Sequence, residues 1–144
     1  MSSIREQIAE NIVEVLKDSR DPKPVLVTRE TLDVENLART QYPAMFITTQ
    51  GETRDPLSLN GSVGSRFASV LFDITCYVNG QNLDTQRNDI IERVEEALAL
   101  DVTRGGVALD TQVIEILVNN EQEPPVGEVL VTVKVEYTYR RGLL

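Results

Sequence analysis

The chain has 144 residues, a length typical of one domain, and its 41% apolar and 26% charged content is ordinary for a soluble globular domain. Its formal net charge is −9 and no run of Lys or Arg is long enough to form a phosphate-binding stripe, which disfavours tight binding to nucleic acid because that affinity depends on clustered basic groups. With no histidine and a single cysteine, the chain lacks the groups of the familiar hydrolase triads and of cysteine-based metal sites.

The first segment predicts a helix over residues 4–17, followed by a short strand over residues 25–28. Ser3 and Glu6 have the spacing of a capping box, and apolar residues recur after them every three or four positions. Two prolines between the helix and the strand end the helix, because proline cannot donate the helical hydrogen bond. Residues 34–38 predict a single helical turn.

A second strand and a long connection come next. Residues 43–49 are apolar enough to lie inside a sheet, and a proline at the start of a strand fits that position. Residues 51–65 contain three glycines and a proline without a regular period, which is long for a connection within a compact domain. We interpret residues 51–65 as a functional or mobile loop, with a twisted hairpin extension that only packs as the alternative.

Residues 66–100 organise the rest of the chain as a long strand, a turn and a long amphipathic helix that folds back on the strand. The even-numbered positions from 68 to 78 are apolar and predict one buried face of the strand. The helix covers that face with an apolar stripe of its own. Phe67, Leu71 and Tyr77 interrupt the polar second face, so we place this strand inside a sheet or at a subunit contact.

Two further strands complete the pattern. Residues 110–119 are largely apolar on both faces, whereas residues 128–140 alternate as a half-buried strand does, with Tyr137 and Tyr139 predicted to be core. The order is therefore α-β-β-β-α-β-β. Grouped strands with only two helices predict one α+β domain over residues 1–144, with a mostly antiparallel sheet of about five strands and two helices packed on it.

The residues indicate no catalytic, cofactor or metal site. The glycines near residues 61–65 lack the Gly-Lys-Ser/Thr ending that grips phosphate, and the carboxylates of the second helix are interpreted as a solvated face. Asp101 and Asp110 lie near element ends but lack the spacing of a calcium loop. Cys76 lies in an apolar strand and is interpreted as a small buried hydrophobe. We expect no enzymatic activity, no cofactor and no metal.

Four segments carry a resemblance to a known family: SIREQIAENIVEVL, YPAMFITTQGETRD, RFASVLFDITCYVNGQNLDTQRNDIIERVEEALALDVTRGG and PPVGEVLVTVKVEYTY. In their order and pattern they resemble the tail-terminator, or tail-completion, proteins of long-tailed bacteriophages. The resemblance implies an α+β subunit that forms a homohexameric ring at the head-proximal end of the tail tube. There the ring halts polymerisation of the tail-tube protein and presents a surface to the head–tail connector protein. It also implies a virion protein of the tail or neck, with DNA passing through the ring without specific binding.

Physical arguments are compatible with this resemblance and leave alternatives open. Strands that are apolar on both faces suit a sheet that continues across subunits, and an acidic lumen would not retain a polyanion. The related roles of head–tail connector or tail-tube subunit share this logic and form the first alternative. The second is a small-molecule-binding or enzymatic α+β domain with its site between the sheet and residues 51–65. No apolar run approaches the roughly 18–20 residues of a membrane span and no signal-peptide region is visible, so we expect assembly in the host cytoplasm without a membrane.

Eight residues are candidate assembly contacts. They are Arg54, Asp55, Arg66, Phe67, Leu71, Tyr77, Arg140 and Arg141. The three apolar members need cover on the second face of the central strand. The last two arginines form a paired cation near the chain end that can meet a carboxylate on a neighbour, with two solvated arginines as the alternative. The remaining three lie in or beside the segment 51–65.

Overall fold

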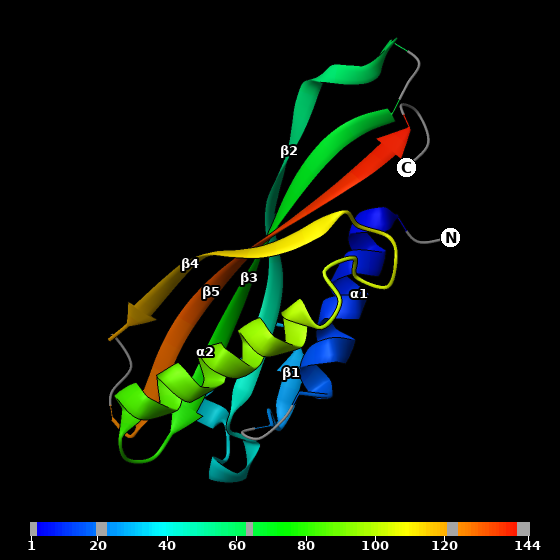
Figure 1. The fold of residues 1–144 in the computed structure, drawn as a ribbon. Helices are drawn as coiled ribbons and strands as arrows, with labels where there is room; N and C mark the ends of the chain where they lie inside the picture. The colour runs from blue at the N-terminus through cyan, green and yellow to red at the C-terminus, as the bar shows by residue number, and fades with distance from the viewer. Residues whose placement is uncertain (1–2, 20–22, 63–64, 121–123, 141–144) are drawn as a thin grey trace.

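The computed structural model describes residues 3–19, 23–62, 65–120 and 124–140, and of residues 55–62, 65 and 140 it describes the backbone only. Within these ranges two α-helices and five strands follow one another as α-β-β-β-α-β-β, which confirms the α+β prediction. The strands form one sheet in the order β1-β2-β3-β5-β4 (Figure 1). All neighbouring strands are antiparallel except β1 and β2, which are parallel.

The observed boundaries agree closely with the periodic segments of the sequence except at β2, which extends well beyond the predicted strand 43–49. The elements are α1 Ile4–Lys17, β1 Leu26–Thr28, β2 Ala44–Ser62, β3 Ser65–Asn79, α2 Leu83–Ala99, β4 Asp110–Asn119 and β5 Val126–Arg140. The helical turn predicted for residues 34–38 is a 3₁₀ turn over Val34–Asn36, and a second 3₁₀ turn follows at Arg39–Gln41. The polar segment between β1 and β2 thus contains only short turns.

The first turn of α1 is capped as the sequence predicts, but only by half of the expected capping box. The hydroxyl of Ser3 accepts a hydrogen bond of 3.2 Å from the backbone N–H of Glu6. The carboxylate of Glu6 instead accepts two hydrogen bonds from Arg29, at 2.6 and 3.1 Å. This pair lowers the pKa of Glu6, chiefly through the hydrogen bond from Arg29. An ion pair therefore connects the start of α1 to the residue that follows β1.

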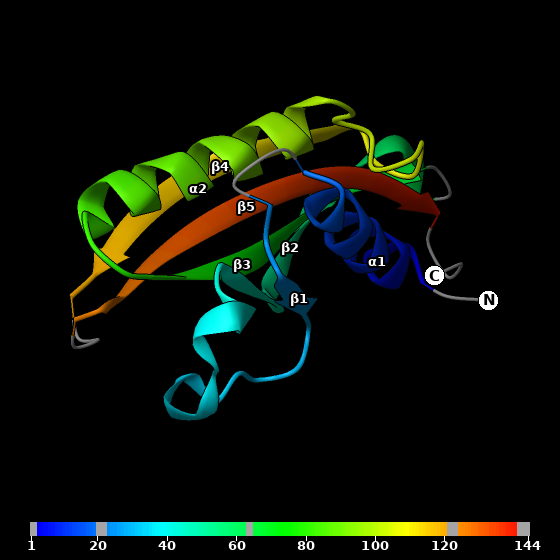
Figure 2. The same cartoon turned by 90° about the horizontal axis from the view of Figure 1, so that it is seen from below.

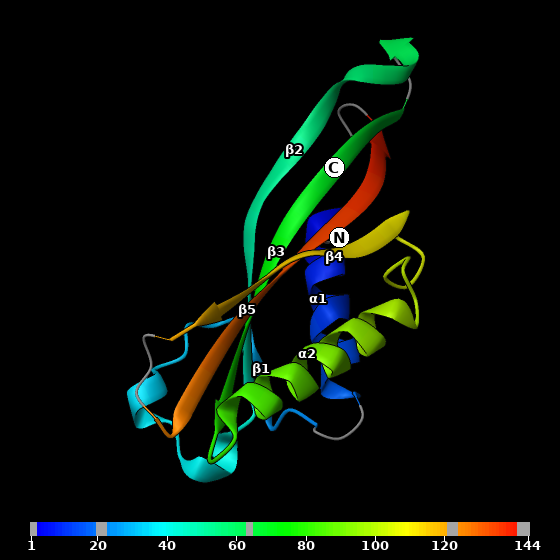
Figure 3. The same ribbon diagram turned by 60° about the vertical axis from the view of Figure 1, so that its left-hand side comes forward.

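One hydrophobic core lies between the sheet and the two helices. Its members include Ile8, Ile12 and Leu16 of α1, Ile90, Val94 and Leu98 of α2, the even-numbered residues 68 to 78 of β3, and Val129, Val131, Val133 and Val135 of β5. Both helices therefore cover the same face of the sheet, as Figure 3 shows. Cys76 is fully buried there, and burial raises the pKa of its thiol to about 12, which confirms that it acts as a buried hydrophobe.

The prediction of an irregular loop over residues 51–65 is wrong. β2 continues to Ser62 and β3 begins at Ser65, and the two strands remain paired in this region, for example Thr53 with Ser69. The sequence hid the strand because the pairing contains register shifts between Thr49 and Gly51 and between Arg54 and Ser58. Each shift inserts extra residues and breaks the period of two by which a strand is recognised. The hairpin alternative describes the backbone correctly.

The end of the β2–β3 hairpin extends past the amino-terminal end of α1, as Figures 1 and 3 show. We call residues 53–62 and 65–69 the projecting hairpin; β5 accompanies it up to Arg140, which pairs with Ser65. Figure 2 shows the twist of β3 and β5 and places the three-residue β1 on the opposite side of the sheet from β4. The fold therefore has a helix-covered body, a projecting hairpin and two different edges.

Candidate functional site

β4 exposes large apolar side chains at one edge of the sheet. The exposed fractions are 49% for Ile114, 39% for Ile116, 50% for Leu117 and 49% for Val118, and we call these four residues the β4 patch. β4 pairs with β5 on its inner side, and no strand among the described residues pairs with its outer side. An exposed apolar edge strand readily accepts a strand from another chain. The β4 patch is therefore the strongest candidate contact surface of the described structure.

The β4 patch extends over both faces of the strand. Ile116 pairs with Val131, which enters the core on the face covered by the helices, whereas Leu117 pairs with Leu130 on the opposite face. The sequence correctly predicts a strand that is apolar on both faces. It does not reveal that this strand lies at the edge of the sheet, so none of the eight candidate contacts belongs to β4. Apolar residues on both faces were the available signal, because such a strand needs cover from two sides.

The three apolar candidates of the central strand lie together on the face opposite the helices. Phe67 pairs with Thr138, Leu71 with Lys134 and Tyr77 with Glu128 of β5. All three side chains are half-buried in the described structure. Burial, followed by the charge of Glu128, raises the pKa of Tyr77 to about 12. The structure thus confirms their common face, while their role in assembly stays a prediction.

Glu52 and Arg54 belong to a polar cluster at the base of the projecting hairpin. The carboxylate of Glu52 accepts hydrogen bonds from Arg54 Nε at 2.7 Å, Arg5 Nη1 at 3.0 Å and the hydroxyl of Tyr137 at 2.6 Å. The guanidinium of Arg54 also lies 4.1 Å from the centre of the Tyr139 ring, a cation–π contact. Arg54, selected as an assembly contact, is therefore engaged within its own subunit.

The protonation of this cluster is set by burial and by its charges. Burial alone would raise the pKa of Glu52, but the hydrogen bonds from Tyr137 and Arg54 and the nearby positive charges outweigh it and lower the pKa. Burial, together with the Glu52 carboxylate, raises the pKa of Tyr137 to about 12. Tyr137 is 1% exposed, which confirms the prediction that it is core, and Tyr139 packs against the core partly buried. Glu52 was missed because it falls in the segment interpreted as a loop.

The other charged candidates are not brought together into one site. Arg66 pairs with Tyr139 in the ladder between β3 and β5 and its side chain is half-buried. The side chains of Asp55 and Arg140 are outside the description, as is the whole of Arg141. Their predicted contacts with a neighbour stay predictions. What the backbone does establish is that Arg54, Arg66 and Arg140 belong to the same end of the sheet.

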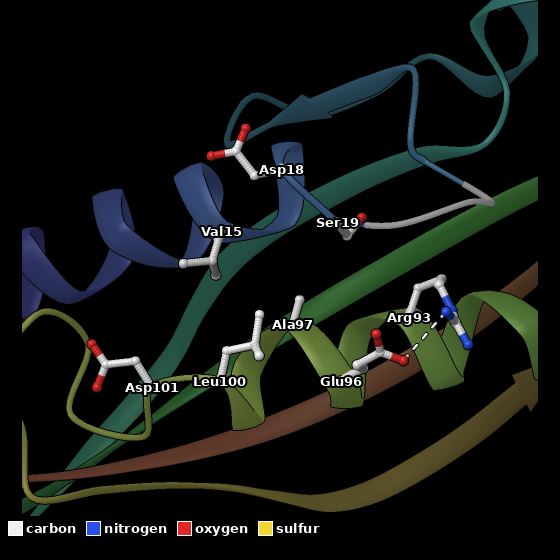
Figure 4. Close-up of a pocket in the computed structure, with 8 residues that line it drawn as sticks. All are labelled: Val15, Asp18, Ser19, Arg93, Glu96, Ala97, Leu100 and Asp101. Carbon is white, nitrogen blue, oxygen red and sulfur yellow. Dashed lines mark ion pairs between the residues drawn. The ribbon is translucent and has the colours of Figure 1, made fainter.

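A pocket of about 220 Å³ lies between α1 and α2 (Figure 4). It is lined by Val15, Asp18, Ser19, Arg93, Glu96, Ala97, Leu100 and Asp101. Arg93 forms ion pairs with Glu92 at 3.1 Å and Glu96 at 3.3 Å, so its charge is already compensated. With three acids, Asp18, Glu96 and Asp101, against Arg93, the lining has a formal charge of −2, which favours a positively charged group. None of the lining residues belongs to the segment 51–65.

The turn after α2 is held by Asp101 and Arg104. The Asp101 carboxylate accepts hydrogen bonds from the backbone N–H groups of Thr103 at 2.9 Å and Gly105 at 3.0 Å, and the bonds from Thr103 are the main reason that its pKa is lowered. Arg104 is 1% exposed and donates to the carbonyls of Leu98, at 2.6 Å, and Asp101. It thus caps the end of α2, while Gly105, with φ +76°, supplies the left-handed turn.

Comparisons with known proteins add no family assignment. No family model matches the sequence, and none of the curated proteins matches it. Among the described residues no group of three or more His, Cys, Asp or Glu side chains is arranged to hold a metal ion. No helix in the described part of the chain is both long and apolar enough to span a membrane.

Proposed function

We propose that this chain is a structural subunit of a phage virion that forms a ring at the head-proximal end of the tail tube. There it stops the addition of tube subunits and offers a surface to the head connector. The observation that carries the proposal is the β4 patch, because an apolar strand edge of this kind is the feature of an assembly subunit. The resemblance of the sequence to tail terminators is the reason for proposing a ring at the end of the tail tube rather than another assembly.

The architecture supports this role without requiring bond-making chemistry. The helices cover one face of the sheet only, which leaves the opposite face, the edges and the projecting hairpin available for other subunits. Head-to-tail contacts between unlike surfaces of identical subunits generate closed rings when the rotation between neighbours closes. A ring bound to the last layer of tube subunits occupies the surface to which the next layer would add.

A capping assay tests the proposal directly. Tube protein is allowed to polymerise in vitro and the purified chain is added at amounts far below those of the tube protein. We expect tubes of shorter and fixed length, since only tube ends are bound, and a ring at one end of each tube in negative-stain images. Elongation that continues unchanged with the chain in excess over tube ends rules out the terminator role.

The same assay separates the neighbouring roles in the neck and tail. A tail-tube subunit would add to the length of the tubes, and a head–tail connector would bind to the head portal without changing tube length. Both roles also need contacts between subunits, so the β4 patch does not distinguish them. Tube length measured as a function of the amount of added chain distinguishes the three roles.

The pocket between α1 and α2 favours a second candidate, a small-molecule-binding domain. Glu96 is paired with Arg93 and Asp101 is bound to backbone N–H groups, so the formal charge of the lining, −2 from three acids and one arginine, is what favours a small amine over an anion. A thermal shift of the monomeric protein with small amines, absent in a Glu96→Gln variant, would support this candidate. No shift at millimolar concentrations of a set of amines would eliminate it.

A further inference from the structure

We infer that the β4 patch is the docking surface for the projecting hairpin of a second copy of this chain. The contact joins two different surfaces, so each copy offers one β4 patch and one projecting hairpin. The closing of such contacts into a ring rests on the proposed function, whereas the contact itself follows from the charge and the pairing of β4 and of the projecting hairpin.

Pairing of β4 with a second β4 is disfavoured by charge. The strand carries Asp110 and Glu115 and no basic residue, and Glu115 lies near its middle. A two-fold symmetric pairing of two β4 strands would place the two copies of Glu115 close together near the axis. Like charges in neighbouring strand positions destabilise the pairing. The partner of β4 is therefore a surface of opposite charge.

The projecting hairpin has that charge. Counting the adjoining Arg140 of β5 and the Glu52–Arg5 pair at its base, this end of the sheet has four arginines, Arg5, Arg54, Arg66 and Arg140, against the two acids Glu52 and Asp55, for a formal charge of +2. β4 has a formal charge of −2 from its two acids. In a chain with a net charge of −9, a basic end of the sheet is unusual and can pair with an acidic strand edge.

Pairing of one hairpin with another hairpin is also disfavoured. β2 contains register shifts between Thr49 and Gly51 and between Arg54 and Ser58, and Pro56 lacks a backbone N–H. Irregularities of this kind protect edge strands against pairing with their own copies. Since pairing of β4 with β4 and of hairpin with hairpin is disfavoured, we infer a contact between the β4 patch of one copy and the projecting hairpin of another. Contacts between unlike surfaces are the type that closes into rings.

Complementary variants test the docking surface. Ile116→Lys with Leu117→Lys changes only the β4 patch, and Thr53→Glu with Arg66→Glu changes only the projecting hairpin. We expect each variant alone to lose self-association by at least about tenfold in concentration, because each places a charge against a surface that repels or excludes it. A mixture of the two variants should form a heterodimer and stop there, since one intact β4 patch can still bind one intact hairpin.

Matched controls use the same types of substitution at exposed positions outside β4 and the projecting hairpin. Leu100→Lys with Val102→Lys alters two exposed apolar residues outside β4, and Arg39→Glu with Thr40→Glu repeats the hairpin substitutions at an exposed 3₁₀ turn. Both controls should associate like the wild type. Sedimentation velocity and native mass spectrometry over a concentration series give the readout, with melting temperatures to confirm that every variant is folded.

Each alternative result overturns the inference in a recognisable way. Self-association of the hairpin variant alone, with a monomeric β4 variant, means that β4 binds β4. Association of both variants at wild-type strength, or a wild-type chain that is monomeric at every concentration, means that the docking surface is wrong. If such variants still cap tubes, the proposed function survives without this contact. If the mixing pattern appears but tubes are not capped, the contact stands and the proposed function fails.

Discussion

At one edge of the sheet β2 contains two register shifts and Pro56, whereas at the other edge β4 exposes apolar side chains on both faces between Ile114 and Val118. β4 has one register shift of its own, between Val113 and Glu115, but neither lysine nor proline. β4 is the last strand of the sheet, and β2 forms the other edge beyond Phe46, where its pairing with β1 ends. They differ in the devices that natural proteins use to prevent pairing between sheet edges.

The difference shows that the two edges have different properties: β2 is protected against pairing with its own copies, whereas β4 is not protected. The register shifts of β2 and its Pro56 limit pairing between two copies of this edge. The β4 edge has apolar surface that a monomer gains nothing by exposing. One sheet can therefore contain an edge protected against pairing with the same edge of another copy and an edge whose apolar residues lack cover within the described subunit.

The largest predicted effect on the free energy of unfolding comes from comparing the same substitution, Ile→Ala, in the buried strand β3 and in the edge strand β4. Ile74 of β3 is fully buried, whereas Ile116 of β4 is 39% exposed. We expect Ile74→Ala to lower the free energy of unfolding by about 3 kcal/mol, because it leaves a cavity in the core. Ile116→Ala should lower it by less than about 1 kcal/mol. Urea denaturation at a concentration where the chain is monomeric gives both values, and equal losses would show that β4 is packed within the subunit.

The next effect concerns the cluster that anchors the projecting hairpin to the body. Glu52→Gln removes the carboxylate that three donors share, and we expect it to lower the free energy of unfolding at pH 7 by about 2 kcal/mol. Because the pKa of Glu52 is lowered by folding, its contribution is present above the pKa of an unfolded glutamate, about 4.3, and disappears as the pH falls through the folded value. The difference between wild type and variant should therefore close below about pH 4.

Denaturation curves at pH 7, 5, 4 and 3 measure this dependence. Glu35→Gln, at an exposed position in the first 3₁₀ turn, is the control and should change little at any pH. A gap between wild type and Glu52→Gln that stays constant down to pH 3 would contradict the assignment of a stabilising charge to Glu52. In that case packing rather than ionisation would explain its contribution.

The sequence predicts the elements well wherever a period repeats without interruption. The strand 110–119 and the end of the first helix at Lys17 are found at the predicted residues, because both depend on local alternation or on a local stripe. The order of elements and the mostly antiparallel sheet follow from the same periods. The helix that covers β3 begins at Leu83, the first apolar residue of its stripe.

Features that depend on distant residues could not be predicted in this way. The edge position of β4 is determined by which strand pairs with β5 on its other side, and no local pattern encodes that choice. Two of the three partners of Glu52 lie 47 and 85 residues away, at Arg5 and Tyr137, so nothing near Glu52 in the sequence indicates these two. The distal part of β2 was missed for a different reason, since its register shifts remove the only local signal that a strand has.

A smaller effect is expected when a charge is placed on the β4 edge, and the same type of substitution in the core provides the contrast. Leu117→Lys places a charge on a residue that is 50% exposed, and we expect the free energy of unfolding to change by no more than about 0.5 kcal/mol. Leu98→Lys, at a position of α2 that is 3% exposed, should prevent stable folding because it buries an unpaired charge. Thermal melts of both variants check the contrast. A large loss with Leu117→Lys would mean that the β4 patch stabilises its own subunit.

The smallest predicted effect on stability comes from the protected edge, where the expected change is in association. Pro56→Thr restores a backbone N–H to β2 and favours a strand, so the hairpin should begin to pair with other hairpins. The change is best made together with Ile116→Lys and Leu117→Lys, which remove docking to β4 and leave hairpin-to-hairpin contact as the process that is measured. We expect new oligomers in sedimentation velocity experiments and a free energy of unfolding within about 0.5 kcal/mol of the parent variant. Asn60→Thr in the same background keeps the proline and should stay monomeric. If Pro56→Thr also stays monomeric, the register shifts alone are sufficient to protect this edge, and the contrast with β4 rests on the geometry of β2 rather than on its proline.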